Sequence, residues 1–232
     1  MKWGVVVFPG SNDDRDTLYA LESALGFDVE PLWHADEDVK NVDAIALPGG
    51  FSYGDYLRCG ALARFSPIMR AVATFADAGG PVLGICNGFQ ILCEAGLLPG
   101  ALVRNRDLQF LCRVEALTVE ATDSAFSSRF DMGERIVIPV KHGEGCYAAD
   151  GETLESLERD NRVIFRYANG APNGSLNDIA GITNAARNVV GLMPHPEHAV
   201  EAALRGTDGR RLFESAADWL AGVGAGKRSA GA

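Results

Sequence analysis

Several features are scarce in this sequence of 232 residues, and each scarcity excludes a class of protein. Basic side chains are in the minority, because 21 Lys and Arg face 31 Asp and Glu and the formal net charge is −10. Surfaces that bind nucleic acid or anionic membranes are basic, so we expect neither kind of partner. No apolar run approaches the length that spans a membrane. A strand pattern starts at Trp3, so we expect no signal peptide before the fold.

Cysteines are few and poorly arranged for cross-linking or metal binding. Their number, five, is odd, and no C-x-x-C pair occurs among Cys59, Cys86, Cys93, Cys112 and Cys146. We therefore expect no disulfide framework and no structural zinc site, and we predict no metal site. Unpaired thiols are typical of a reducing compartment, so we expect the protein to be cytoplasmic.

The first hundred residues alternate between strand and helix patterns. Apolar runs predict strands at 3–8, 27–32, 43–47 and 82–85, and helical spacing of apolar residues precedes Gly26 and covers 62–78. Short connections between such elements predict a flavodoxin-like α/β fold, with an open, mostly parallel sheet and helices on both faces. In sheets of this kind the functional site lies beyond the carboxyl ends of the strands.

The second half has a different pattern. Short strands are predicted at 114–119, 135–140, 163–167 and 189–193, with polar turns and no long helix between them, and a last helix follows Thr207-Asp208. We interpret this region as an antiparallel extension of the same sheet. We predict one domain over residues 1–221 and a disordered Gly/Ala-rich tail over 222–232. Gly226-Lys227 in this tail lacks the other residues of a phosphate-binding loop.

One stretch carries a recognisable chemical motif. The buried strand 82–85 leads into Gly84-x-Cys86-x-Gly88, which is the nucleophile elbow G-x-S-x-G with a thiol in place of the hydroxyl. The two glycines are required because a Cβ at either position would collide with a neighbouring strand or helix. The thiol would lie at the amino end of the next helix, where partial positive charge favours the thiolate. The alternative is a small buried structural cysteine.

A cysteine nucleophile needs a base, and His195 is the best candidate among the four histidines. It directly follows a predicted strand, its backbone is restricted by two flanking prolines, and Glu197 is close enough in sequence to orient its ring. His34 has no chemical context, and His198 is expected to be exposed. His142 lies in a Gly-rich loop that could approach a ligand.

Backbone amides are expected to stabilise the oxyanion. The amide of Asn87 follows the nucleophile, and the Gly49-Gly50 turn is the candidate for a second donor because bare backbone can approach a ligand closely. The turn at Pro9-Gly10, the Gly49-Gly50 turn and Cys86 all follow predicted parallel strands. We therefore expect them to converge at one edge of the sheet.

These residues leave more than one functional class open. A cysteine hydrolase or peptidase on a flavodoxin-like scaffold also uses a cysteine elbow, although His-Pro-Glu late in the chain is unusual there. A catalytically silent binding subunit is another interpretation, which the intact Cys86, His195 and Glu197 disfavour.

The motifs resemble a known family. Gly84-Ile85-Cys86-Asn87-Gly88-Phe89-Gln90, followed far downstream by His195-Pro196-Glu197, is similar to the class I (triad) glutamine amidotransferases. The long block from Pro48 to Gly60, with His142-Gly143-Glu144-Gly145 and Asn173-Gly174-Ser175, resembles the branch of glutaminase subunits that serves de novo purine biosynthesis. Two positions depart from the pattern: Asp13, where many members have cysteine, and His198, where arginine is frequent. We expect both departures to affect local contacts only.

The resemblance implies a function. Cys86 would attack the carboxamide of glutamine, His195 and Glu197 would complete a triad, and the Gly50 and Asn87 amides would form the oxyanion hole. Gly49, Phe51, Gln90, His142 and Gly143 would contact L-glutamine. The ammonia would pass to a large synthetase subunit that uses ATP and Mg²⁺ to convert formylglycinamide ribonucleotide to formylglycinamidine ribonucleotide. A small bridging subunit would complete the complex, and this chain would need no cofactor of its own.

Overall fold

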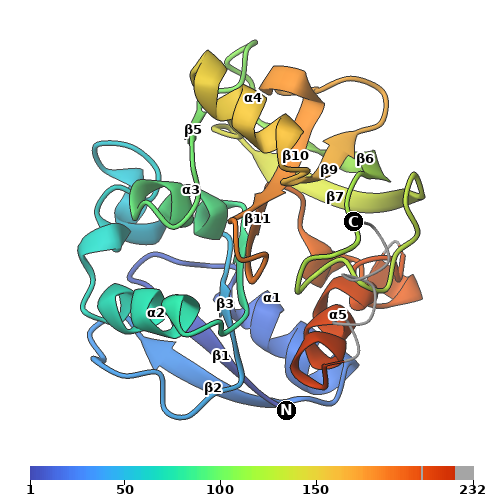
Figure 1. Cartoon of the computed structure of the whole chain (residues 1–232). Coiled ribbons are helices and arrows are strands. Elements are labelled where there is room, and N and C mark those ends of the chain that lie inside the picture. The colour runs from blue at the N-terminus through green and yellow to red at the C-terminus, as the bar shows by residue number, and fades with distance from the viewer. Residues whose placement is uncertain (205, 223–232) are drawn as a thin grey trace.

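The computed structural model describes residues 1–204 and 206–222 and is built around one nine-stranded sheet (Figure 1). The strand order is β2-β1-β3-β4-β11-β10-β9-β6-β7. The first five strands are mutually parallel, and every later pairing is antiparallel. The sheet is therefore divided at β11, and the predicted open α/β fold with an antiparallel extension is confirmed.

The parallel half consists of five short strands. These are β1 (Lys2–Val7), β2 (Asp28–Trp33), β3 (Ala44–Leu47), β4 (Val82–Ile85) and β11 (Val189–Leu192). Every residue of β3, β4 and β11 is buried. This burial on both faces explains why these strands are continuous apolar runs without polar alternation.

Helices cover both faces of the parallel half (Figure 1). On one face lie α2 (Ile68–Asp77) and α3 (Asn87–Glu94). On the other lie α5 (Arg210–Leu220) and α1 (Asp14–Tyr19), which continues as a π-helical segment over Ala20–Ala24. Helix α2 begins six residues after Leu62, because a 3₁₀ turn at Ala63–Phe65 and Pro67 interrupt the helical path.

The antiparallel half consists of β10 (Ile179–Thr183), β9 (Val163–Tyr167), β6 (Leu111–Val119) and β7 (Arg135–His142). A separate two-stranded sheet pairs β5 (Ala101–Val103) with β8 (Cys146–Ala148). Short 3₁₀ turns occupy Ser52–Asp55, Leu176–Asp178, Pro196–His198 and Ala202–Leu204.

Two local predictions for the second half were wrong. Helix α4 (Gly151–Arg159), capped by the Asp150 carboxylate, lies where no helix was expected, and β10 was missed although it is central in the sheet. The Asp208 carboxylate does not cap α5 but accepts a hydrogen bond of 2.8 Å from the Val137 amide.

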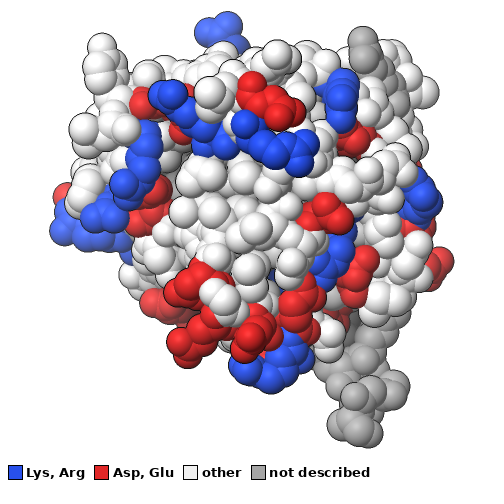
Figure 2. Space-filling model, turned by 90° about the horizontal axis from the view of Figure 1, so that it is seen from above, with Lys and Arg blue, Asp and Glu red and all other residues white. Residues whose placement is uncertain are grey.

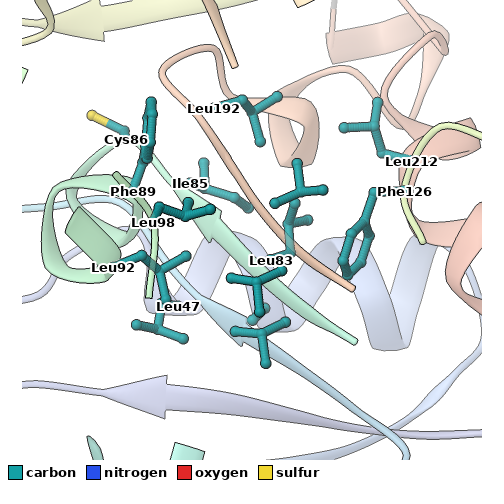
Figure 3. Close-up of a cluster of buried hydrophobic side chains, with 14 of the residues drawn as sticks. Leu47, Leu83, Ile85, Cys86, Phe89, Leu92, Leu98, Phe126, Leu192 and Leu212 are labelled. Atoms are coloured by element: carbon teal, nitrogen blue, oxygen red, sulfur yellow. The ribbon is translucent and has the colours of Figure 1, made fainter. Parts of the chain in front are cut away.

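One hydrophobic core cluster extends through both halves of the sheet. Leu83 and Ile85 of β4, Leu192 of β11 and Phe89 of α3 lie in it, and Cys86 lies at its edge with the sulfur pointing away (Figure 3). The thiol is thus carried on the buried core.

The surface carries both signs of charge. The face seen in Figure 2 has groups of basic and groups of acidic side chains and no continuous basic surface. Among the described residues, no helix is long and apolar enough to cross a membrane. The predicted tail and the Gly226-Lys227 motif lie, apart from Gly222, outside the described residues.

Candidate active site

Cys86 occupies a strained turn between β4 and α3. Its backbone has φ 51° and ψ −103°, a conformation that L-residues rarely adopt. A Cβ at Gly84 would lie 2.8 Å from Gly88 backbone atoms, and one at Gly88 would lie 2.0 Å from the carbonyl oxygen of Leu47. Both glycines are therefore required by close packing, as predicted from the elbow motif. The side chain of Cys86 is buried but lines a cavity.

The His195–Glu197 pair is present and fully buried. Glu197 Oε1 accepts a hydrogen bond of 2.6 Å from His195 Nδ1. Glu197 reaches the ring from the 3₁₀ turn that follows β11. The backbone amide of His195 donates to the carbonyl of Pro139 in β7 at 2.8 Å, which anchors the imidazole to the antiparallel half.

The electrostatics of the pair favour a charged imidazole. Burial by itself lowers the pKa of His195, but the negative charges of Glu197 and Cys86 outweigh burial and raise that pKa to about 10. Burial raises the pKa of Glu197, and the imidazolium outweighs it and lowers that pKa overall. The other ring nitrogen, Nε2, is buried and has no hydrogen-bond partner within the described residues. It is therefore free to exchange a proton with the thiol.

The two departures from the family pattern both lie at the active site, so the expectation that they affect only local contacts was wrong. Asp13 Oδ2 lies 3.7 Å from His195 Nδ1, and Asp13 Oδ1 forms an ion pair of 2.5 Å with Lys141 Nζ. His198 Nε2 lies 3.6 Å from Glu197 Oε1, and its ring centroid is 5.5 Å from that of His195. His198 is half-buried rather than exposed, because the turn that carries Glu197 also folds His198 inward.

These side chains also form a cluster of potential metal ligands. One ligand atom from each of Asp13, His195, Glu197 and His198 lies within 4.8 Å of the others. The ammonium group of Lys141 already contacts Asp13 in this cluster. The ammonium group of Lys141 therefore supplies a positive charge to this cluster.

A cavity of about 320 Å³ opens over Cys86. Six of the predicted site residues line it, namely Gly50, Phe51, Cys86, Gln90, His142 and Gly143. Seven other lining residues were missed, namely Asn12, Asp13, Asp55, Cys59, Phe110, Lys141 and Glu144. Asp13 and Lys141 could have been predicted at the site, because each adjoins in sequence a segment that was placed there. Asp55, Cys59 and Glu144 lie within motifs that carry the family resemblance, whereas Asn12 and Phe110 lie in loops with no motif.

Gly49 and Asn87 were predicted at the site and are not among the residues that line the cavity. A Cβ at Gly49 would lie 2.5 Å from Asp13 Oδ2 and 2.7 Å from His195 Cε1, so Gly49 lies behind the triad. Asn87 is the first residue of α3, where helix amides lack an intrahelical partner. Its side chain accepts from the Ser52 amide at 3.2 Å and donates to Gln90 Oε1 at 2.8 Å.

The turn after β3 packs closely against the segment that follows β1. Gly50 has φ +126°, and a Cβ there would lie 2.7 Å from the Asn12 amide. In the described part of the chain the Gly50 amide forms no hydrogen bond. The turns at Pro9-Gly10 and Gly50 meet, because the Tyr53 amide donates to the Pro9 carbonyl at 2.6 Å. The predicted convergence of the loops at one sheet edge is confirmed.

The opposite wall of the cavity comes from β7 and the loop after it. Gln90 Nε2 donates to the carbonyl of Glu144 at 2.5 Å and ties this loop to α3. His142 is buried, and Asn105 Oδ1 lies 3.2 Å from its Nδ1. Burial and the charge of His195 lower the pKa of His142 to about 4, so this ring is neutral at pH 7.

A second thiol lies in the same cavity. Cys59 lines it and is buried, and burial together with the charges of Asp55 and Glu144 raises its pKa. The Cys59 thiol therefore stays protonated at neutral pH and is a poor nucleophile.

Comparison with known proteins places this site in a family. A model of the CobB/CobQ-like glutamine amidotransferase domain matches residues 1–220. The chain is 56% identical to phosphoribosylformylglycinamidine synthase subunit PurQ from Trichormus variabilis, over 92% of this chain and 96% of that protein. It is also 56% identical to the subunit of the same name from Moorella thermoacetica, over 94% of this chain and 96% of that protein.

Solved structures agree with this placement. The structure of PurLQS from Thermotoga maritima matches with a TM-score of 0.87 and 45% identity, over 94% of this chain and 98% of that chain. A glutamine amidotransferase from Thermotoga maritima matches with a TM-score of 0.55 at 16% identity, over 99% of this chain and 95% of that chain, which shows the fold alone.

The fold and the elbow with its buried His–Glu pair define a glutamine amidotransferase of the class I type. More narrowly, the chain belongs to the PurQ family, the glutaminase subunits of phosphoribosylformylglycinamidine synthase in purine biosynthesis.

Proposed function

We propose that Cys86, His195 and Glu197 act as a catalytic triad that hydrolyses L-glutamine. The Cys86 thiol gives its proton to His195 Nε2, and the sulfur attacks the side-chain carboxamide carbon. The Gly50 and Asn87 amides are placed to stabilise the resulting oxyanion, and each such donor typically contributes about 2.7–4 kcal/mol. The C–N bond then breaks, and the imidazolium returns the proton to the leaving ammonia.

Hydrolysis completes the cycle. Water attacks the glutamyl thioester with His195 as general base, the C–S bond breaks, and the thiol is restored as glutamate leaves. Glu197 holds the imidazole in place and stabilises its charged form in both steps. We assign Phe51, Gln90, His142 and Gly143 to the binding of glutamine. Gly49 contributes by leaving room for His195.

We further propose that the ammonia is used by other subunits of the same enzyme. The support is the match to the PurLQS structure. A large subunit would consume ATP and Mg²⁺ to form formylglycinamidine ribonucleotide, and a small subunit would bridge the two. We place this activity in the cytoplasm, consistent with the five cysteines, all of which are free.

The observation that carries the proposal is the position of the thiol. Cys86 is held in a strained elbow at a helix amino terminus, opens into a cavity, and adjoins a buried imidazole whose pKa it helps to raise. A structural cysteine needs none of these features. An elbow with a fully buried His–Glu pair is the arrangement that nucleophilic acyl transfer requires.

Replacement of Cys86 tests the proposal in the complex with its partner subunits. We expect Cys86→Ala to abolish glutamine-dependent turnover and to leave turnover from added ammonium salt unchanged, because only the ammonia source is lost. His195→Ala should lower glutamine-dependent turnover by at least about 10²-fold, the low end for a general base. The measurement is product formation with each nitrogen source.

Cys59→Ala is the matched control, because it removes the other thiol of the cavity. It should retain glutamine-dependent turnover. Unchanged glutamine-dependent turnover in Cys86→Ala would overturn the proposal. Loss of the ammonium-dependent reaction in the same variant would show damage to the complex and would also contradict the assigned role.

A further inference from the structure

The orientation of the Asp13 side chain is not the one expected of a residue that precedes a helix. It precedes α1, where an aspartate normally caps the helix, but its carboxylate makes no capping hydrogen bond. The residue is 5% exposed and turned toward the active site. One oxygen contacts Lys141 Nζ at 2.5 Å, and the other lies 3.7 Å from His195 Nδ1.

Lys141 connects this carboxylate to the nucleophile. Its ammonium group holds Asp13, and its backbone carbonyl lies 3.9 Å from Cys86 Sγ. Burial lowers the pKa of Lys141, but the charges of Asp13, Glu197 and Asp16 outweigh burial and raise it. The ammonium therefore stays charged inside the site and balances one of the two carboxylates that face His195.

The packing around Gly49 shows that the arrangement is closely fitted. Asp13 Oδ2 and His195 Cε1 both lie where a Cβ of residue 49 would be, at 2.5 Å and 2.7 Å. Because Gly49 has no side chain, the Asp13 carboxylate and the edge of the His195 ring can approach the same point. Movement of Asp13 would therefore release the imidazole on that side.

Several charged or titratable groups face His195 from the elements around it. Glu197 contacts Nδ1 from the same turn, and His198 follows it. Asp13 approaches from the segment before α1. The remaining groups are Cys86 from the elbow and Lys141 and His142 from β7. Of these groups, Glu197 and Asp13 have a carboxylate oxygen within 4 Å of Nδ1, at 2.6 Å and 3.7 Å, and Lys141 contacts the latter carboxylate.

We propose that Asp13, held by Lys141, is a second carboxylate for the catalytic histidine and a positioning residue for the ring of His195. The proposal rests on the proposed Cys86–His195 chemistry. Glu197 accepts the ring N–H, and the Asp13–Lys141 pair sets the orientation of the ring and balances its charge. Neither residue of the pair bonds to glutamine in this role.

The test removes each charge of the pair in turn in the full chain. The titration of the His195 ring is followed by NMR with selectively labelled histidine, and its signal is assigned with His195→Gln. Asp13→Asn leaves the Lys141 ammonium unbalanced beside the imidazole, so the titration midpoint of His195 should fall by about one pH unit. Lys141→Met leaves the Asp13 carboxylate unbalanced, so the midpoint should rise. The double variant should lie between the two.

Opposite shifts are a signature that a merely structural role would not produce. Shifts of the same sign, or no shift in either variant, would overturn the proposal. A matched control is Glu30→Gln with Lys2→Met, which removes a Lys–carboxylate pair of 3.0 Å at the other end of β1 and should leave the midpoint unchanged. Circular dichroism checks that each variant is folded. If Asp13→Asn does not fold, Lys141→Met and the double variant still show the direction of the shift in the His195 midpoint.

Turnover adds a second readout. In the complex, Asp13→Asn should lower kcat for glutamine about 10-fold with KM nearly unchanged, because the ring is misaligned while the binding wall is intact. A change confined to KM would contradict the positioning role. The NMR experiment does not involve glutamine and tests only the role of Asp13. The proposed function is tested separately by Cys86→Ala, so the two failures are distinguishable.

Discussion

The parallel and antiparallel halves of the sheet contribute opposite walls of the same cavity, but they are held in place by different forces. On the parallel side, the turns after β1, β3 and β4 are fixed by close backbone packing. Gly88 and Gly50 lie where any Cβ would collide with backbone atoms. This wall carries the thiol and the proposed oxyanion donors, and its position is determined by steric contact.

On the antiparallel side, the loop after β7 is held by buried polar side chains. Asn105 donates to the carbonyls of His142 at 2.9 Å and Gln109 at 2.8 Å and accepts from the Gly145 amide at 3.0 Å. Asn173 Nδ2 donates to the Gly145 carbonyl at 2.7 Å. This loop depends on satisfied hydrogen bonds.

The difference suggests a division of labour. The reacting groups need a geometry that does not adjust, and close packing supplies it. The proposed binding wall needs only a defined shape, and hydrogen bonds that can open and reform supply it. The two walls should therefore respond to different substitutions, and the comparison can be tested from the largest expected effect to the smallest.

The largest effect is expected from Gly88→Ala in the parallel wall. Its Cβ would lie 2.0 Å from the Leu47 carbonyl oxygen, so β3 and α3 would have to separate. We expect the free energy of unfolding to fall by at least about 3 kcal/mol, as measured by urea denaturation. Gly143→Ala is the control in the opposite wall, because the nearest atom there, Phe110 Cδ2, is 3.6 Å away. Equal urea midpoints in the two variants would contradict the comparison.

A smaller effect is expected from Asn105→Ala in the antiparallel wall. The substitution leaves the buried Gly145 amide and His142 carbonyl without a partner, which should cost about 2–3 kcal/mol of stability. Because the loop forms the proposed binding wall, KM for glutamine should rise while the alkylation rate of Cys86 stays unchanged.

Asn184→Ala is the matched control for this effect. Asn184 also holds a turn through its side chain, accepting from the Val189 amide at 3.1 Å, but it lies before β11 and away from the cavity. It should lose stability without a change in KM. A change in Cys86 reactivity in Asn105→Ala would show that the two walls are not separable.

The smallest effect is a dependence on pH. The pKa of His142 is about 4 in the folded protein because of burial and the charge of His195, against an ordinary value of 6.5. The unfolded chain therefore binds a proton that the folded chain does not as pH falls from 7 to 5, which should remove about 2 kcal/mol of stability. Urea midpoints of wild type and His142→Gln at the two pH values measure this, and an equal loss in both would refute it.

His195 should act in the opposite direction, because its pKa is raised to about 10 by Glu197 and Cys86 against the effect of burial. Its contribution to stability is present below pH 6.5 and is lost as pH rises through 10. The histidine of the binding wall therefore weakens the fold on the acid side, and the histidine at the sheet boundary weakens it on the alkaline side.

The parallel half was predictable because its signals are local. Val82–Ile85 was placed without error, since a short apolar run followed by Gly-x-Cys-x-Gly has few alternatives. The antiparallel half was less predictable. Strand β10 contains Gly181 and follows a 3₁₀ turn, and α4 has a mostly polar sequence, so neither produced a clear apolar pattern. Their formation depends on packing against β9 and β11.

The sequence alone determined the elbow, the His–Glu pair and the mostly parallel sheet, because strained turns, proline-flanked residues and buried strands each require particular residue types at fixed spacing. Tertiary structure decided the surroundings of His195. Asp13, Lys141 and Gly49 are 36 to 128 positions apart in sequence, and they meet only because β1, β3 and β7 end on one side of the sheet. No local sequence pattern predicts that these three residues lie together, since each by itself is an ordinary helix start, strand residue or turn residue.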